Sequence, residues 1–224
     1  LGDVYKRQVV FCTFTRWVGQ GATPPEYDES DSKRNEFWGW NSNPEEAIRK
    51  YARALVDTVF KYNYDGLDID YEPSYYSGPL VNSEEYMTIL IEELGKHIGP
   101  KSENPDRLFI IDGQSIFPKL IENFSYFVSQ AYATTGSPND NTSNTETYLD
   151  QILDGYVKLY ADYLTEEQVT NRLIVTENLE AADFALKGGF KFYDRNQVLM
   201  EGIPSLVGFA MCCLLYTSDA ADDL

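Results

Sequence analysis

The chain has 224 residues, 43 % of them hydrophobic and 14 % aromatic, and its 36 Asp and Glu against 18 Lys and Arg give a formal net charge of −18. This length fits one domain with a sizeable core, the aromatic content argues against disorder, and no run reaches the roughly 18 to 20 apolar residues of a membrane span. The negative charge repels phosphate backbones and argues against a nucleic-acid partner, while three Cys and one His form neither a disulfide framework nor a zinc or His-rich metal centre.

The two ends of the chain differ in character from the sequence between them. Residues 1–8, LGDVYKRQ, and residues 213–224, CLLYTSDAADDL, resemble translated sequencing-adapter sequence. Such segments are set aside before the fold is considered. We therefore expect residues 9–212 to hold the natural domain and both tails to be sequencing artefacts, so that the natural start of the protein is missing.

Between these ends, apolar runs predict six strands and amphipathic patterns predict three helices. The expected strands are Val9–Phe14, Gly66–Tyr71, Leu108–Ile111, Tyr126–Tyr132, Leu173–Thr176 and Leu206–Ala210. The expected helices are Asn43–Phe60, Asn82–Gly99 and Leu149–Leu164. The first helix has the clearest start, because Asn43 can cap it, Pro44 suits its first turn and Glu46 follows three residues after the cap. The polar stretches between these elements are expected to be loops.

Strands that are apolar on both faces and alternate with helices indicate an α/β fold with a parallel sheet covered by helices. Two architectures satisfy this pattern, an open doubly wound sheet and a (β/α)8 TIM barrel. No Gly-rich phosphate loop follows the strand Val9–Phe14, which weakens the nucleotide-binding form of the open sheet. Periodicity alone leaves both architectures open.

The strand Gly66–Tyr71 and its flanks carry an unusual number of acids. Side chains alternate along a strand, so Asp68, Asp70 and Glu72 share one face, spaced roughly 6.5 Å apart. Three carboxylates on a buried strand cost free energy, and their repulsion raises at least one pKa. Such a row provides a protonated acid beside an ionised carboxylate at neutral pH, which is the arrangement that glycoside hydrolysis requires.

Two other interpretations of the acidic row are a solvated edge strand and a calcium loop. The calcium loop needs Gly at its sixth position and Glu at its twelfth. Counted from Asp68, those positions hold Pro73 and Pro79, so the calcium interpretation fails. The solvated edge strand remains possible on the local pattern.

The segment from Asp65 to Glu72 resembles the Asp-x-x-Asp-x-Asp-x-Glu motif of glycoside hydrolase family 18, the chitinases and endo-β-N-acetylglucosaminidases. The resemblance implies a (β/α)8 barrel with the motif on its fourth strand and the glutamate at the carboxyl end, where barrel active sites lie. It also implies that Glu72 is the general acid, that Asp70 orients the substrate's 2-acetamido group, and that Asp68 supports Asp70. Asp65 would be a structural acid at the start of the strand, which we group with the substrate-binding residues.

A second resemblance lies at the end of the strand Tyr126–Tyr132. Gln130 and Tyr132 match the Gln-x-Tyr pattern of bacterial endo-β-N-acetylglucosaminidases, whereas chitinases usually carry Met-x-Tyr-Asp and here Ala133 follows the tyrosine. The resemblance implies that Tyr132 donates a hydrogen bond to the acetamido carbonyl and that Gln130 contacts the same sugar; a core tyrosine is the alternative. Trp38 and Trp40 would either stack on sugar or anchor their loop.

The resemblance implies a glycosidase that hydrolyses β-1,4 linkages next to N-acetylglucosamine by a retaining mechanism in which the sugar's own amide is the nucleophile. We expect an endo-β-N-acetylglucosaminidase acting on the chitobiose core of N-glycans, with that glycan as its partner and no metal or organic cofactor. The alternatives are a chitinase and a non-catalytic carbohydrate-binding protein on the same barrel. Relatives of this kind are usually exported, so we expect a cell-surface, periplasmic or secreted protein.

The family places three strands before the acidic strand, where this sequence shows only Val9–Phe14. We therefore expect residues 9–212 to be a partial catalytic barrel, holding strands three to eight of a fold of about 250 residues. Missing strands leave open sheet edges. On that ground the isolated chain is expected to be inactive and prone to aggregate.

Overall fold

The computed structural model describes residues 8–130, 145–178 and 208–212. The chain divides into two compact units, Leu1–Phe127 and Val128–Leu224, and each unit is described by itself. Among the described residues, no helix is both long and apolar enough to cross a membrane.

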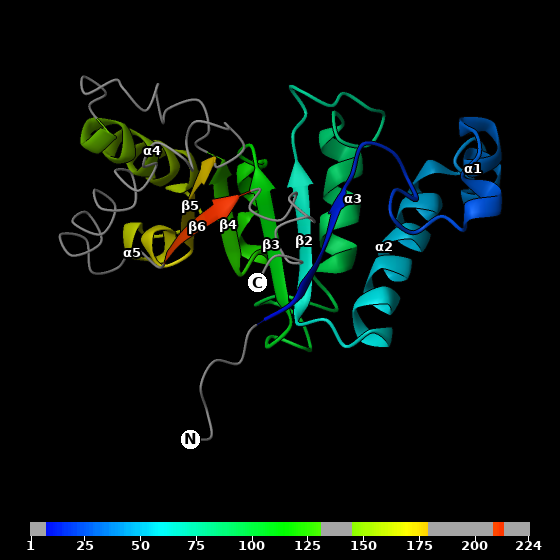
Figure 1. The fold of residues 1–224 in the computed structure, drawn as a ribbon, viewed down its shortest axis with the longest axis horizontal. Coiled ribbons are helices and arrows are strands. Elements are labelled where there is room, and N and C mark those ends of the chain that lie inside the picture. Colours follow the sequence, from blue (N-terminus) through cyan, green and yellow to red (C-terminus); the bar gives the residue numbers. More distant parts are fainter. Residues whose placement is uncertain (1–7, 131–144, 179–207, 213–224) are drawn as a thin grey trace, which may run out of the picture. The chain divides into compact units, whose positions relative to one another are not determined.

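The first unit is built on three parallel strands, β1 (Val10–Phe14), β2 (Gly66–Tyr71) and β3 (Leu108–Gly113). β2 pairs with β1 on one side and with β3 on the other, and the arrows of β2 and β3 point the same way in Figure 1. The predicted parallel sheet is confirmed for these strands. β3 runs two residues beyond the predicted end at Ile111, and β4 (Tyr126–Gln130) follows it in the chain.

Helices α2 (Pro44–Lys61) and α3 (Glu84–Leu94) of this unit each begin after a residue whose side-chain oxygen accepts a hydrogen bond from an N–H group of the first turn. α2 starts as predicted, with the Oδ1 of Asn43 accepting a hydrogen bond from the Glu46 N–H at 3.2 Å. α3 is shorter than predicted, because Ser83 caps it in place of Asn82 and it ends at Gly95.

In the first unit, three short helical segments lie where loops were predicted. They are η1 (Pro25–Tyr27), α1 (Asp31–Trp38) and η2 (Pro118–Asn123). The signal for α1 is local, because the Ser30 hydroxyl accepts a hydrogen bond from the Lys33 N–H, but α1 lacks an apolar stripe. Helical periodicity therefore could not reveal it.

The core of the first unit lies between β2 and its helices. Leu67 and Ile69 of β2 have no exposed surface, and α2 contacts both β2 and α3, which lies beside it in Figure 1. α2 and α3 bury the apolar stripes that predicted them. The fully buried members are Ile48, Tyr51, Ala52, Leu55, Val59, Met87, Leu90, Ile91 and Leu94. Each large side chain buried in this way contributes about 1.5–3 kcal/mol, which holds one face of β2 against the helices.

The second unit contains α4 (Thr145–Tyr160), α5 (Glu166–Thr170), β5 (Leu173–Asn178) and β6 (Gly208–Cys212). β5 and β6 pair in parallel, with Ile174 opposite Gly208. The strand predicted at Leu206–Ala210 ends two residues too early, since β6 extends to Cys212, and its predicted first two residues lie outside the described residues. α5 was not predicted, because its five residues are held by a capping box between Thr165 and Gln168 and show no helical period.

Candidate active site

The candidate site lies on β2, which has one apolar face and one acidic face. Leu67 and Ile69 are fully buried, and the alternation of a strand places Asp68 and Asp70 on the other face. Glu72 follows the last residue of β2 and is half-buried. Because all three strands are parallel, Glu72 lies at their common carboxyl end.

Strand register groups further residues with these acids. Asp68 lies opposite Cys12 of β1 and Ile110 of β3, and Asp70 lies opposite Phe14 and Asp112. Since β2 has a neighbouring strand on each side, it is an interior strand. The solvated-edge interpretation of the acidic row is therefore wrong.

Asp112 is a fourth acid of this face, and the sequence analysis missed it. Its charge is the second cause of the raised pKa of Asp68, after burial, and it also acts on the thiol of Cys12. The hydrophobic pattern predicts a strand that ends at Ile111, which places Asp112 in the following loop. Only the register with Asp70 shows that it belongs to the acidic row.

Asp68 is a strongly perturbed carboxyl group of this row. Burial, followed by the charge of Asp112, raises its pKa from 3.8 to about 7, although a hydrogen bond with Cys12 acts in the opposite direction. Its Oδ1 atom is buried and has no hydrogen-bond partner within the described part of the chain. An acid of this kind is partly protonated at neutral pH and can donate a hydrogen bond to a neighbouring carboxylate.

The raised pKa of Asp68 gives a prediction for stability. Asp68 binds its proton more tightly in the folded than in the unfolded chain, so its favourable contribution is complete below pH 3.8 and is lost as the pH rises through about 7. Asp68→Asn removes this ionisation. We expect the variant to gain stability over the natural protein between pH 4 and pH 8, by on the order of a few kcal/mol, in urea unfolding followed by circular dichroism.

A matched variant tests the cause of that gain. Asp112→Asn removes a charge that raises the pKa of Asp68, so stability should fall less steeply with pH than in the natural protein. If the free energy of unfolding of Asp68→Asn exceeded that of the natural protein by the same amount at pH 4 and at pH 8, the gain would not come from the ionisation of Asp68.

Asp65 lies at the opposite end of β2 from Glu72. Its Oδ2 accepts a hydrogen bond from the Val9 N–H at 2.7 Å, and its carbonyl oxygen accepts one from the Leu108 N–H at 2.8 Å. Asp65 thus ties the amino ends of the three strands together. Seven residues of extended chain, roughly 23 Å, separate it from Glu72, and its grouping with the substrate-binding residues stays a prediction.

Of the remaining two predicted residues, the structure describes one. Gln130 is the last residue of β4 and is half-buried, while Tyr132 lies outside the described residues. Their contacts with substrate stay predictions. The described residues contain no group of His, Cys, Asp and Glu arranged to hold a metal ion.

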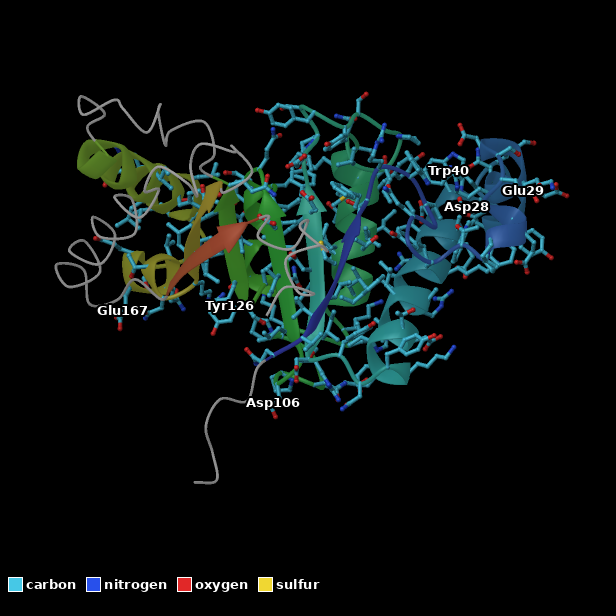
Figure 2. The ribbon with its side chains drawn as sticks, viewed as in Figure 1. Asp28, Glu29, Trp40, Asp106, Tyr126 and Glu167 are labelled. Carbon is cyan, nitrogen blue, oxygen red and sulfur yellow. The ribbon has the colours of Figure 1, made fainter. Side chains whose placement is uncertain are left out.

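The structure describes the contacts of both tryptophans. Trp38 is buried and its Nε1–H donates to the Thr23 hydroxyl at 2.8 Å. Trp40 packs edge-on against Tyr86 of α3, with ring centroids 5.3 Å apart, and lies away from β2 and β3 in Figure 2. Loop anchoring is therefore the role of Trp38, whereas Trp40 is only half-buried and either role stays a prediction for it.

Comparison with known proteins agrees with this arrangement. Residues 8–212 match the family model described as glycoside hydrolase family 18, BT1044-like. The endo-β-N-acetylglucosaminidase EndoS of Streptococcus pyogenes serotype M1 is 34% identical over 142 residues, which are 56% of this chain and 14% of that protein. An endo-β-N-acetylglucosaminidase of Bifidobacterium longum subsp. infantis is 34% identical over 99 residues, 42% of this chain and 17% of the relative. The chain thus spans under a fifth of the length of either relative.

Solved structures show the same fold. A selenomethionine Glu-to-Gln variant of BT1044 has a TM-score of 0.62 and 22% identity, covering 91% of this chain and 63% of that one. A chitinase from Bacteroides thetaiotaomicron has a TM-score of 0.53 and 11% identity, covering 84% and 69%. Of the two predicted architectures, the TIM-barrel-like α/β fold is therefore the correct one. With a family match across almost all of its length, the chain belongs to glycoside hydrolase family 18.

Proposed function

We propose that this protein is an endo-β-N-acetylglucosaminidase that cleaves the chitobiose core of N-glycans by a substrate-assisted retaining mechanism. The observation that carries the proposal is the order of acids on an interior strand, with Asp68 and Asp70 on one face of β2 and Glu72 at its carboxyl end. In a barrel of family 18, that end is where the substrate binds.

Glu72 is the general acid and base of the proposed reaction. Its carboxyl group protonates the glycosidic oxygen as the bond to the anomeric carbon breaks. The acetamido oxygen of the same sugar attacks that carbon and forms a cyclic oxazolinium ion. Glu72, now a carboxylate, accepts a proton from water as the water attacks, which opens the ring and restores the original anomeric configuration.

Asp70 and Asp68 support the nucleophile in this proposal. Asp70 orients the acetamido group through its N–H and stabilises the positive charge that develops on it. Asp68, whose pKa is about 7, can share a proton with Asp70 and adjust the charge of the row as the reaction proceeds. Gln130 and Tyr132 are proposed to hold the same acetamido group. All of this chemistry uses carboxyl groups and the substrate's own amide.

Two observations favour an endoglycosidase over a chitinase. The relatives that are 34% identical to this chain are both named endo-β-N-acetylglucosaminidases. The Gln130 and Tyr132 pattern, with Ala133 following, points the same way. A chitinase would use the same three acids. The expected export from the cell suits both N-glycans and chitin as substrates. A non-catalytic sugar-binding protein is disfavoured because Glu72 is present.

Substrate choice is tested with the protein encoded by the complete reading frame. We expect it to release the glycan from an N-glycoprotein and leave one N-acetylglucosamine on each Asn, which mass spectrometry of the protein detects. Chitin oligomers should be hydrolysed with a kcat/KM at least about tenfold lower, a loss of roughly 1.4 kcal/mol of transition-state stabilisation. Faster hydrolysis of the oligomers would instead assign a chitinase, and turnover of neither substrate would favour a binding protein.

A further inference from the structure

We propose that Gln114 is a positioning residue that fixes the backbone carrying Glu72. This inference rests on the proposed function, and it adds a residue outside the acidic motif. Gln114 follows β3 directly after Gly113, in the loop beside the carboxyl end of β2. It is held against the Glu72 segment by contacts on both sides of that residue.

The first contacts are two hydrogen bonds that enclose Glu72. The backbone N–H of Gln114 donates to the carbonyl oxygen of Tyr71 at 2.8 Å. The backbone N–H of Ser74 donates to the side-chain Oε1 of Gln114 at 3.3 Å. One residue of the β3 loop therefore holds the chain immediately before Glu72 and again two residues after it.

Gly113 makes this close approach possible. Its φ of +101° lies in a region that L-residues rarely adopt. A Cβ atom at this position would lie 2.7 Å from the carbonyl oxygen of Tyr71 and 3.1 Å from the Cγ of Glu72. The Glu72 side chain thus lies directly against the backbone of Gly113, which supports it on the β3 side.

The turn after Glu72 depends on this support. The Glu72 carbonyl oxygen accepts hydrogen bonds from the N–H groups of Tyr75 and Tyr76, at 3.1 and 2.9 Å. Pro73 has no N–H, so the Ser74 N–H is the first donor after Glu72, and Gln114 accepts from it. The Pro73 carbonyl oxygen also accepts a hydrogen bond from the Asn82 side chain at 3.2 Å, so removing the Gln114 amide takes away one of the two side-chain hydrogen bonds that hold the segment between the end of β2 and the turn. Misplacing a catalytic group by about 1 Å can cost about 10²-fold in rate.

The test compares two leaving groups in Gln114→Ala. Glu72 must protonate a sugar leaving group, whereas an aryl leaving group departs with little assistance. We expect kcat/KM, which reports the step that releases the leaving group, to fall about 10- to 100-fold on the N-glycan and less than about threefold on an aryl β-glycoside of N-acetylglucosamine oligomers. A loss of structure would lower both rates equally, so equal losses overturn the inference.

Gln20→Ala is the matched control, because the Oε1 of Gln20 accepts a hydrogen bond from the Arg16 N–H at 3.1 Å in the loop after β1. It should show no leaving-group dependence. Gly113→Ala keeps the Gln114 amide but places a methyl group against Glu72, and should reproduce the signature of Gln114→Ala. The inference fails if neither Gln114→Ala nor Gly113→Ala shows a larger loss on the N-glycan than on the aryl substrate, while the natural enzyme hydrolyses both substrates. If the natural enzyme hydrolyses neither substrate, the proposed function fails.

Discussion

Glu72→Gln is expected to lower kcat on an N-glycan by about 10²- to 10⁴-fold while the affinity for the glycan stays within a few-fold of the natural value. Gln has nearly the shape of Glu and keeps a hydrogen-bonding end, but it cannot give a proton to the glycosidic oxygen. Steady-state kinetics and calorimetric titration with an uncleaved glycan measure the two quantities separately.

The control for this change is Glu45→Gln, which removes one acid from the exposed first turn of α2 and lies outside the site. It should leave kcat unchanged. Undiminished turnover in Glu72→Gln would show that another group supplies the proton. Loss of both turnover and glycan binding would show that Glu72 shapes the site rather than protonates the substrate.

The local parts of the fold could be predicted because their causes are local. Asn43 caps α2 as its side chain predicted, and the helical stripe that begins with Ala47 is buried along its length except at Phe60. The strand Gly66–Tyr71 has the predicted bounds. Capping, alternation and helical period are properties of a few consecutive residues, so they can be read from one segment at a time.

The missed elements depend on contacts that are distant in sequence. α1 has a Ser30 cap but no apolar stripe. Its Trp38 is buried through a hydrogen bond to the Thr23 hydroxyl and an edge-on ring contact with Tyr51. β3 continues to Gly113 because its polar residue Asp112 pairs in register with Asp70. A prediction from hydrophobic residues alone stops such a strand too early, because the strand continues through a polar residue that faces the candidate site.

The candidate site divides in the same way. Asp68, Asp70 and Glu72 were found because one strand carries them with the alternation of a strand. Asp112 and Gln114 come from β3 and the loop that follows it, and each joins the site through a partner about forty residues away in the chain. A single sequence contains no signal that pairs them with β2, whereas the strand register identifies Asp112 and the hydrogen bonds to Tyr71 and Ser74 identify Gln114.

Asp70→Asn separates the two steps of the proposed mechanism. The acetamido group must attack the anomeric carbon whichever leaving group departs, so the loss of its carboxylate partner should slow both substrates. We expect kcat to fall about 10²- to 10³-fold on an N-glycan and by a similar factor on an aryl β-glycoside. This pattern differs from that of Glu72→Gln, whose loss of kcat/KM should be much smaller on the aryl substrate, because kcat/KM reports the step that releases the leaving group.

The comparison depends on a variant that removes the same charge elsewhere. Asp106→Asn does so in an exposed residue just before the amino end of β3, at the far end of the strands from Glu72 (Figure 2), and it should leave both rates unchanged. If Asp70→Asn slowed only the N-glycan, Asp70 would be assisting proton transfer through Glu72. If it changed only KM, the acetamido group would be bound but not activated, and substrate assistance would be wrong. Equal losses on the two leaving groups, in a variant whose urea unfolding midpoint matches that of the natural protein, are the result that places Asp70 with the nucleophile.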